Sequence, residues 1–292
     1  MGNLLAKIAP DSSLSLDLYP PSSKFEPERD IADLSGKVAL VTGGNTGIGF
    51  HTVKQLLLKN AKVYLAARSP EKGAEAIQRL EADTGRIAIF LQLDLADLAS
   101  DLQFGTNVTG HYFLTELLLP ALISSYEATQ VPARVINTSS SGHKEACPRT
   151  GIDFVSLKGG PERDAWLKKL SPSAAGWRLY GESKLGNIII SNYFAKTHSN
   201  VLVSCALHPG SVRTDLQKNL PGWMQRLLDI ALVPAVMGAY TQLWAGTTAT
   251  PEQINAQYLI PWARIGKADP IASSSKLEEE TMAWLKEQVK GF

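Results

Sequence analysis

Tyr180 and Lys184 are the two side chains of this sequence whose types and spacing most clearly suggest chemistry. They stand four positions apart, so in a helix both project from one face. A lysine ammonium close to a phenol stabilises the phenolate and lowers a phenol pKa that starts at about 10. A tyrosine tuned in this way exchanges a proton with an alcohol or a carbonyl near neutral pH. The same spacing also occurs on solvated helix faces. The catalytic interpretation of the pair therefore depends on other motifs in the sequence.

One companion is the glycine-rich stretch at residues 43–49, Gly-Gly-Asn-Thr-Gly-Ile-Gly. It follows an apolar run at 38–41 that is typical of a fully buried parallel strand, and it precedes an amphipathic run at 51–59 that favours a helix. A glycine turn at a helix N-terminus offers free N–H groups and the positive end of the helix dipole, which suit a diphosphate. The spacing differs from the commoner Gly-x-Gly-x-x-Gly dinucleotide fingerprint. A purely structural turn is the alternative.

The end of the second predicted strand, residues 62–67, bears on which cofactor would bind. A carboxylate there would bind the ribose hydroxyl of NAD. This sequence has Arg68 instead, with Lys72 one helical turn further on. Two cations suit a 2′-phosphate, which favours NADP(H), although a solvated pair of surface charges would look the same.

The elements that must position these residues alternate between strand and helix. The order through residue 93 is strand, helix, strand, helix (70–81), strand (87–93), which calls for a parallel sheet with right-handed crossovers. Further on we expect a long apolar helix at 102–126, a strand at 134–138, an irregular charged excursion at 149–173, a helix at 177–196 and a strand at 201–207. An apolar helical region broken at Pro234 follows at 221–244, and the chain ends in an amphipathic helix at 276–290.

Composition narrows the function classes. The chain of 292 residues has 29 basic and 28 acidic residues, so a nucleic acid or an acidic membrane is not the expected partner. Two cysteines and no Cys-x-x-Cys fit a reducing compartment, and we expect a cytoplasmic protein without disulfides. The histidines lack zinc-ligand spacing, so no metal site is expected. No apolar run is long enough to span a bilayer. We divide the chain into an N-terminal extension, 1–33, and a single NADP-binding domain, 34–292.

Together, the glycine stretch, the serines that follow the predicted strand at 134–138, the Tyr-x-x-x-Lys pair and the sequence His-Pro-Gly-Ser-Val-Arg-Thr at 208–214 resemble the short-chain dehydrogenase/reductase family. The sequence that flanks these motifs is most similar to the retinol-dehydrogenase-like branch of the family, including fungal members associated with secondary metabolism. The resemblance covers most of residues 33–246. It implies a Rossmann-like, doubly wound parallel sheet with helices on both faces, and hydride transfer between a nicotinamide and a carbonyl or alcohol.

The resemblance also implies roles for single residues. Tyr180 would be the general acid/base, Lys184 would hold the nicotinamide ribose and depress the tyrosine pKa, and Ser140 would bond to the substrate oxygen. Ser139 rivals Ser140, because the serine run leaves the register open by one. Asn107 would order a water of the proton relay; the alternative is an internal polar residue bonded to a neighbouring carbonyl. The residues implied to contact the cofactor are Gly43, Asn45, Gly47, Ile48, Gly49, Arg68, Lys72, Asp94, Asn107, Tyr180, Lys184, Pro209, Gly210, Val212 and Thr214.

The sequence departs from the family between Asp94 and Asn107. The family has a crossover helix there and a fourth strand that ends in an Asn-Asn-Ala-Gly-like loop, and neither is present here. The gap amounts to roughly 30 or more residues, about one βα unit. We therefore expect a sheet that lacks one central βα unit and closes the gap by pairing residues 38–41 directly with 134–138.

Two functional hypotheses follow. The first is an NADP(H)-dependent oxidoreductase acting on a hydrophobic or polyketide-like carbonyl or alcohol, with the apolar region at 221–244 covering the substrate. The second is a catalytically impaired Rossmann-like protein that acts by binding or regulation. Substrate identity, reaction direction and homodimer formation stay open.

Overall fold

The computed structural model describes residues 20–96, 102–212 and 232–292. The contacts of the chain divide it into two compact units, and each is described by itself. Unit 1 comprises residues up to 94 together with 209–249 and 260–264, and unit 2 comprises 95–208, 250–259 and 265–292. Within these described ranges, no helix has the length and apolar character needed to cross a membrane.

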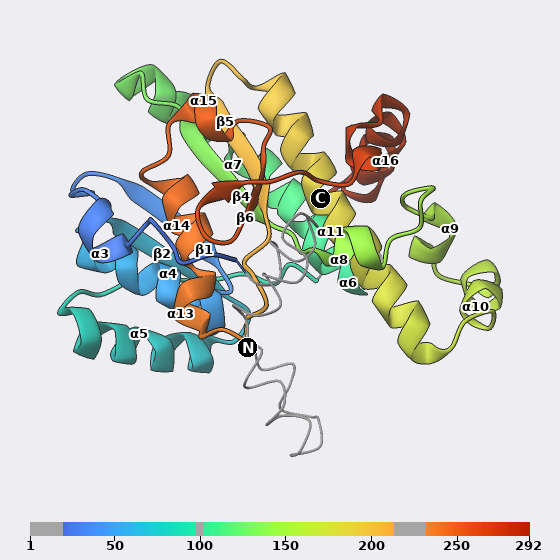
Figure 1. The fold of residues 1–292 in the computed structure, drawn as a ribbon, viewed down its shortest axis with the longest axis horizontal. Coiled ribbons are helices and arrows are strands. Elements are labelled where there is room, and N and C mark those ends of the chain that lie inside the picture. The colour runs from blue at the N-terminus through green and yellow to red at the C-terminus, as the bar shows by residue number, and fades with distance from the viewer. Residues whose placement is uncertain (1–19, 97–101, 213–231) are drawn as a thin grey trace. The chain divides into compact units, whose positions relative to one another are not determined.

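Unit 1 contains a three-stranded parallel sheet in the order β1-β2-β3, of which β1 and β2 are labelled in Figure 1. Its strands alternate with helices, as the sequence predicts, since α4 joins β1 to β2 and α5 joins β2 to β3. The elements of this unit are α3 (Pro27–Asp30), β1 (Val38–Thr42), α4 (Gly47–Leu58), β2 (Lys62–Ala67), α5 (Pro70–Thr84), β3 (Ile89–Gln92), α13 (Ala235–Gly238) and α14 (Tyr240–Gly246).

Local sequence explains why α5 begins and ends where it does. The Ser69 hydroxyl caps the helix by accepting from the Lys72 N–H at 3.2 Å, and Pro70 occupies the first helical position. At the other end Gly85 takes the left-handed conformation that stops a helix (φ 68°). The apolar face of α5 then buries Leu80 in the core of unit 1, beside Leu65 of β2.

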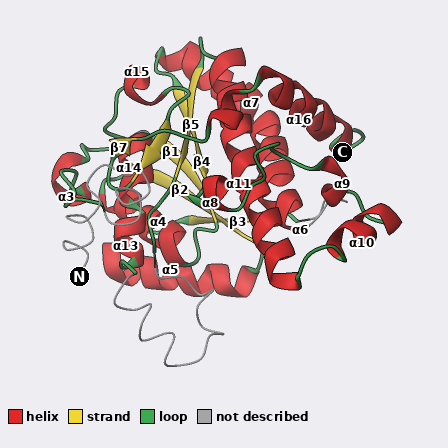
Figure 2. Ribbon diagram, turned by 45° about the vertical axis from the view of Figure 1, so that its right-hand side comes forward, coloured by secondary structure: helices red, strands yellow, loops and turns green. Residues whose placement is uncertain are grey.

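Unit 2 contains most of a four-stranded sheet in the order β4-β5-β6-β7, in which β4, β5 and β6 run parallel. Its strands lie among helices, the longest of which is α11 (Figure 2). The sheet is formed by β4 (Ala133–Thr138), β5 (Leu202–Leu207), β6 (Tyr258–Ile260) and β7 (Arg264–Ile265). The helices of this unit are α6 (Leu102–Phe104), η1 (Gly105–Thr109), α7 (Gly110–Thr129), α8 (Gly142–Glu145), α9 (Phe154–Leu157), α10 (Pro161–Leu167), α11 (Pro172–Thr197), α15 (Pro251–Ile254), η3 (Pro270–Ser273) and α16 (Ser275–Gln288).

Two predicted segments differ from the structure. The predicted continuous helix at 102–126 is interrupted by η1, a five-residue π-helix, before α7 begins. The excursion at 149–173 is not irregular, because it forms α9 and α10. Asp153 caps α9 by accepting from the Val155 N–H at 3.2 Å, and α10 buries Trp166 against α11. Strand β6 was not predicted at all, since its three residues carry no distinctive pattern.

The first strand differs from the prediction of full burial. Val38 is 65% exposed and the rest of β1 is half-buried, so that prediction is wrong. Within the described residues β1 pairs with β2, and an edge strand can satisfy its other row of backbone groups with water. Strand β1 belongs to unit 1 and β4 to unit 2, so the expected direct pairing of residues 38–41 with 134–138 stays a prediction.

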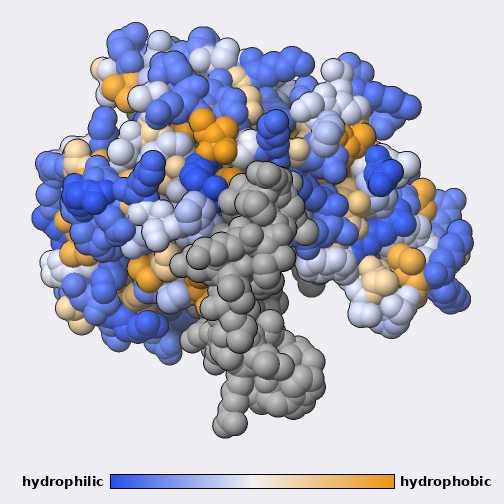
Figure 3. Space-filling model, viewed as in Figure 1, coloured by the Kyte–Doolittle hydropathy of each residue, from blue (hydrophilic) through white to orange (hydrophobic). Residues whose placement is uncertain are grey.

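The surface is mixed in character. In the view of Figure 3 hydrophilic side chains dominate, and apolar ones are scattered among them. The apolar region predicted at 221–244 is described only from residue 232 onward, where it forms α13 and α14, separated from the residues before them by Pro234. The part at 221–231 lies outside the described residues.

Candidate active site

In unit 2, the end of β4 and the middle of α11 bring Ser140 and Tyr180 together. The Ser140 hydroxyl accepts from the Gly142 N–H at 3.1 Å, and it lies close enough to the Tyr180 phenol to lower the pKa of that phenol. Gly142 leaves the room that this arrangement needs, since a Cβ there would stand 2.8 Å from Cε1 of Tyr180. Both side chains are half-buried. A serine and a tyrosine hydroxyl therefore face one another at the end of a parallel strand.

The geometry separates the two candidate serines. Ser139 is 2% exposed, and its hydroxyl donates to the Lys184 carbonyl at 2.7 Å. This bond ties β4 to α11 and occupies the Ser139 donor. Ser140, one position on, is the serine whose hydroxyl meets Tyr180. Of the two candidates that the sequence leaves open, the arrangement favours Ser140.

Lys184 lies beside Tyr180. Its ammonium donates to the Thr138 carbonyl at 3.3 Å and stands 5.6 Å from the centroid of the Tyr180 ring. Burial raises the pKa of Tyr180, opposed by the hydrogen bond from Ser140, and burial lowers the pKa of Lys184 to about 8. Lys184 is not among the groups that shift the Tyr180 pKa in this structure, where burial is the largest cause and raises it, so the depression of the tyrosine pKa by the lysine stays a prediction.

Asn107 lies in the π-helix η1, and its amide donates to the Ser183 hydroxyl at 3.0 Å. Ser183 in turn donates to the Tyr180 carbonyl at 2.8 Å, so Asn107 is linked through one side chain to the backbone of α11. A π-turn within a helix often marks a functional position. The predicted alternative, a bond from Asn107 to a neighbouring carbonyl, is not what this contact shows, since the acceptor is a hydroxyl.

His111 is a neighbour of this group that the sequence reasoning missed. Its Nδ1 lies 3.0 Å from the Thr106 carbonyl, and its pKa falls to about 4, mainly through burial and partly through the charge of Lys184. The imidazole is therefore neutral at physiological pH. Its position four residues after Asn107, on the same helical face, was the available signal.

A second set of contacts that the sequence did not predict holds α9 and α10 to α11. The fully buried carboxylate of Glu182 accepts from the Arg178 guanidinium at 3.0 Å and from the Ser156 hydroxyl at 3.1 Å. Arg178 also pairs with Asp153 at 3.1 Å and stacks over the ring of Trp166 at 4.9 Å. Burial raises the pKa of Glu182, opposed by these partners. The excursion is thus anchored directly beside Tyr180 on the same helix.

In unit 1, the glycine-rich stretch forms the turn between β1 and α4. Gly47 has a positive φ (53°), and a Cβ on Gly49 would lie 2.3 Å from the Gly43 carbonyl oxygen, so neither position accommodates another residue without rearrangement. Thr46 makes no side-chain cap. Within the described ranges, the amides of Gly47, Ile48 and Gly49 at the start of α4 have no recorded hydrogen-bond acceptor. These donors fit a diphosphate group.

The other residues implied to contact a cofactor also lie in unit 1. Arg68 directly follows β2 and Lys72 lies in the first turn of α5; both are exposed, and neither forms an ion pair within the part of the chain described here. Asp94 is exposed just beyond β3. Thr214 lies outside the described residues.

The segment that begins at Pro209 approaches the glycine stretch through α13. Gly210 has a positive φ (95°), and Val212 is buried and bridges to Val233. A Cβ on Gly238 would stand 2.8 Å from Val212 and 2.9 Å from Ile48, so both side chains pack on this glycine. Residues far apart in sequence are thus gathered within one unit.

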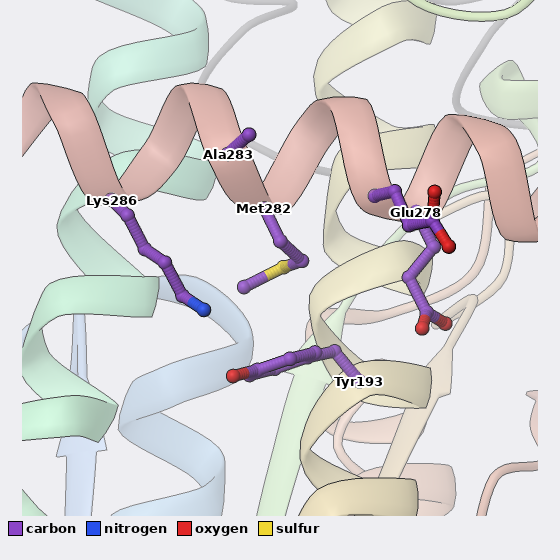
Figure 4. A pocket seen from close by; sticks show the side chains of 6 residues that line it. Tyr193, Glu278, Met282, Ala283 and Lys286 are labelled. Carbon is purple, nitrogen blue, oxygen red and sulfur yellow. The ribbon is translucent and has the colours of Figure 1, made fainter.

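The predicted site residues therefore fall into two sets. Those implied to contact only the cofactor lie in unit 1, and those implied for proton transfer lie in unit 2. A separate cavity of about 340 Å³ in unit 2 is lined by none of them (Figure 4). It lies where Tyr193 of α11 faces α16, and its other lining residues are Glu278, Glu279, Met282, Ala283 and Lys286.

Comparison with known proteins identifies the family of the chain. Residues 37–104 match the family model of short-chain dehydrogenases. A short-chain dehydrogenase/reductase of Armillaria gallica is 42% identical, over 96% of this chain and 98% of its own. Retinol dehydrogenase 11 of Mus musculus is 30% identical, over 77% of this chain and 78% of its own. The retinol-dehydrogenase-like resemblance expected from the sequence is confirmed.

Solved structures give the same fold at lower identity. A protein of Mycobacterium paratuberculosis superposes with a TM-score of 0.65 at 20% identity, over 91% of this chain and 97% of its own. A short-chain dehydrogenase of Shigella flexneri, complexed with NADP, gives a TM-score of 0.56 at 18% identity, over 78% of this chain and 98% of its own. The fold is thus the expected Rossmann-like α/β fold.

The alignment with the Armillaria protein also bears on the predicted gap. It runs over 318 positions, more than the 292 residues of the chain, so it contains positions at which this chain has no residue. The sequence identity to the Armillaria protein and the coverage of both chains show that the chain belongs to the short-chain dehydrogenase/reductase family.

Proposed function

We propose that the protein is an NADP(H)-dependent oxidoreductase that transfers a hydride between the nicotinamide and a carbonyl or alcohol group of a small hydrophobic substrate. The observation that carries this proposal is the meeting of the Ser140 and Tyr180 hydroxyls, with Lys184 beside them. Hydroxyls placed in this way are suited to hold a substrate oxygen and to exchange its proton.

Each of the three side chains then has a part in proton transfer. The Ser140 hydroxyl would bond to the substrate oxygen and orient it. The Tyr180 phenol would give its proton to that oxygen during reduction and take it back during oxidation. Because burial raises the Tyr180 pKa, the phenol is protonated in the protein alone, which suits the reductive direction. Lys184 would bind the ribose hydroxyls of the nicotinamide, and Asn107 would hold a water of the proton relay.

NADP(H) is proposed from the residues of unit 1. The free amides of Gly47, Ile48 and Gly49 would hold the diphosphate, and exposed Arg68 and Lys72 would hold the 2′-phosphate. The bound cofactor would supply or accept the hydride. Two similar folds, from Shigella flexneri and Escherichia coli, are short-chain dehydrogenases complexed with NADP and NADPH respectively, which supports the same choice here.

The substrate class is inferred from the relatives and from the chain itself. The name of the mouse relative points to a hydrophobic alcohol as its substrate. Several similar short-chain dehydrogenase/reductases come from fungi, which fits the expectation of a polyketide-like substrate of secondary metabolism. We further propose a cytoplasmic location and a homodimer.

A second candidate, an impaired relative that acts by binding, is favoured by one observation. Strands β1 and β4 each lie at the edge of a separate sheet in the described chain. The family match ends at residue 104, and the Armillaria alignment contains gaps in this chain. We propose that one βα unit is absent between Asp94 and Asn107, and that the chain binds NADPH weakly and is close to inactive.

One set of measurements decides between the two candidates. NADPH and NADH are titrated into the purified chain, and turnover is then followed on a panel of ketones and alcohols. The oxidoreductase proposal expects NADPH binding and NADPH-dependent reduction. A matched chain, in which the corresponding segment of the Armillaria protein is inserted between Ser100 and Asp101, tests the gap. A rise in melting temperature and activity would favour the impaired form, and tight NADPH binding with turnover by the original chain would reject it.

A further inference from the structure

Trp177 lies on α11, one helical turn before Tyr180, and its ring stacks on the tyrosine ring. The ring centroids are 5.5 Å apart, and the ring planes differ by 17°. Despite this contact the indole is 50% exposed. A large apolar ring that stands half in water beside a half-buried phenol is a surface that gains from being covered.

A second tryptophan in the same unit shows what a structural indole looks like here. Trp166 is 9% exposed, its Nε1 donates to the Asp153 carboxylate at 2.8 Å, and the Arg178 guanidinium covers its ring. Trp177 has no recorded hydrogen-bond partner among the described residues. A Cβ on the neighbouring Gly176 would meet nothing within 4 Å, so the chain beside the indole is open. The indole of Trp166 thus packs inside the protein, whereas the exposed face of Trp177 is free to contact a ligand.

The ring on which Trp177 stacks is itself held in place. Gly142 packs closely on Tyr180, since a Cβ there would stand 2.8 Å from Cε1 of the tyrosine ring and 3.5 Å from the Ser140 Oγ. The indole stands at a defined place beside the phenol that would exchange the proton, with 5.5 Å between the ring centroids. A planar ring resting against this indole would be oriented relative to that phenol, whereas a flexible aliphatic chain would gain much less from the contact.

We infer that Trp177 is a specificity-determining residue that contacts the ring of a planar aromatic carbonyl or alcohol substrate. The inference rests on the proposed function and adds the class of substrate. Its chemistry is the stacking of aromatic faces, which needs no charge and no hydrogen bond from the substrate.

Two ketones with twelve carbons each, 2-acetylnaphthalene and 2-dodecanone, test the inference in the full chain. Trp177→Ala should lower kcat/KM for the aromatic ketone about threefold to tenfold, mainly through KM, and should change the aliphatic one less than twofold. Trp177→Phe should restore part of the loss. Leu117→Ala, which removes an exposed apolar side chain of α7, is the matched control and should affect neither ketone. Equal losses for the two ketones in Trp177→Ala would overturn the inference.

A binding measurement separates this inference from the proposed function. The affinity of 1-(2-naphthyl)ethanol for the wild type and for Trp177→Ala is measured by calorimetry without turnover. A threefold to tenfold weaker affinity in the variant supports the role of Trp177 even if the chain proves inactive. Unchanged affinity, or no binding to the wild type, rejects that role even if the chain reduces ketones.

Discussion

Unit 1 and unit 2 present their predicted site residues in different ways. In unit 1 the glycine stretch offers backbone amides, within seven consecutive positions. In unit 2 the group around Tyr180 consists of side chains from η1, the end of β4 and α11. A backbone site depends on local conformation, whereas a side-chain site depends on the packing of distant segments. The backbone site of unit 1 should be sensitive to substitutions that add side-chain atoms. The side-chain site of unit 2 should be sensitive to substitutions that remove functional groups.

The two units also differ in whether their ionisable side chains are buried or exposed. Unit 2 places Lys184, His111 and Glu182 where desolvation shifts their pKa values, whereas the two cations of unit 1 implied to bind phosphate, Arg68 and Lys72, are exposed. Exposed cations can attract an anion, whereas desolvation shifts the proton affinity of a buried group. The two units are thus suited to binding and to proton transfer respectively.

The largest expected effect is in unit 2. Tyr180→Phe keeps the ring against Trp177 and removes the proton donor. We expect turnover to fall by roughly 10²–10⁴-fold, the usual scale for general acid–base catalysis, with little change in NADPH affinity. Steady-state kinetics and a cofactor titration measure both. Tyr193→Phe, on the same helix but in the cavity of Figure 4, is the control that should keep its activity. Undiminished turnover in Tyr180→Phe would reject the assignment.

Adding one methyl group should damage unit 1. In Gly49→Ala the new Cβ meets the Gly43 carbonyl oxygen at 2.3 Å, and both partners are backbone, so the turn must shift. Overpacking of about 1–3 kcal/mol corresponds to an NADPH affinity weaker by roughly 5- to 150-fold. Gly246→Ala is the matched control, because a Cβ there meets nothing within 4 Å. If both variants bind NADPH like the wild type, the glycine turn does not hold the diphosphate.

Cofactor preference should respond to a single exposed charge. Arg68→Asp replaces a partner for the 2′-phosphate with a carboxylate suited to a ribose hydroxyl. Loss of a charge-assisted bond, at the low end of its usual range because Arg68 is exposed, should lower the ratio of NADPH to NADH affinity about tenfold. Titration of both cofactors into both proteins gives the ratio. An unchanged ratio would show that Arg68 is only a surface charge.

The smallest effect concerns stability and pH in unit 2. Burial lowers the pKa of Lys184 to about 8 from 10.5, so the folded state loses this proton before the unfolded state does. The unfolded state then binds more protons above pH 8, and the free energy of unfolding should rise with pH through this group by less than about 1.4 kcal/mol per pH unit.

The measurement compares denaturant unfolding of the wild type and Lys184→Met between pH 8 and pH 10. The buried Cys205 thiol, whose pKa burial raises to about 12, is common to both proteins, so the difference isolates the lysine. Lys196→Met removes an exposed lysine from the same helix and serves as the control. Parallel pH profiles of the wild type and Lys184→Met would mean that Lys184 is solvated in solution.

The sequence alone determined the features that local interactions control. The alternation of β1, α4, β2, α5 and β3 follows from short apolar runs, a proline and a serine at a helix start, and a glycine at its end. The glycine turn follows as well, because the positive φ of Gly47 and the close approach at Gly49 leave few other residues for these positions. The four-residue spacing of Tyr180 and Lys184 fixed their common helix face before any packing was known.

The tertiary structure alone decided what depends on distant segments. The preference for Ser140 over Ser139 in our proposal rests on the bond from Ser139 to the Lys184 carbonyl, 45 positions away. The direction of the Tyr180 pKa follows from its burial, which no spacing reveals. The exposure of β1 and the added strand β6 depend on which segments pack and pair. Local patterns specify conformation, but burial and strand pairing are properties of the whole packed chain, because they depend on segments that sequence order does not place side by side.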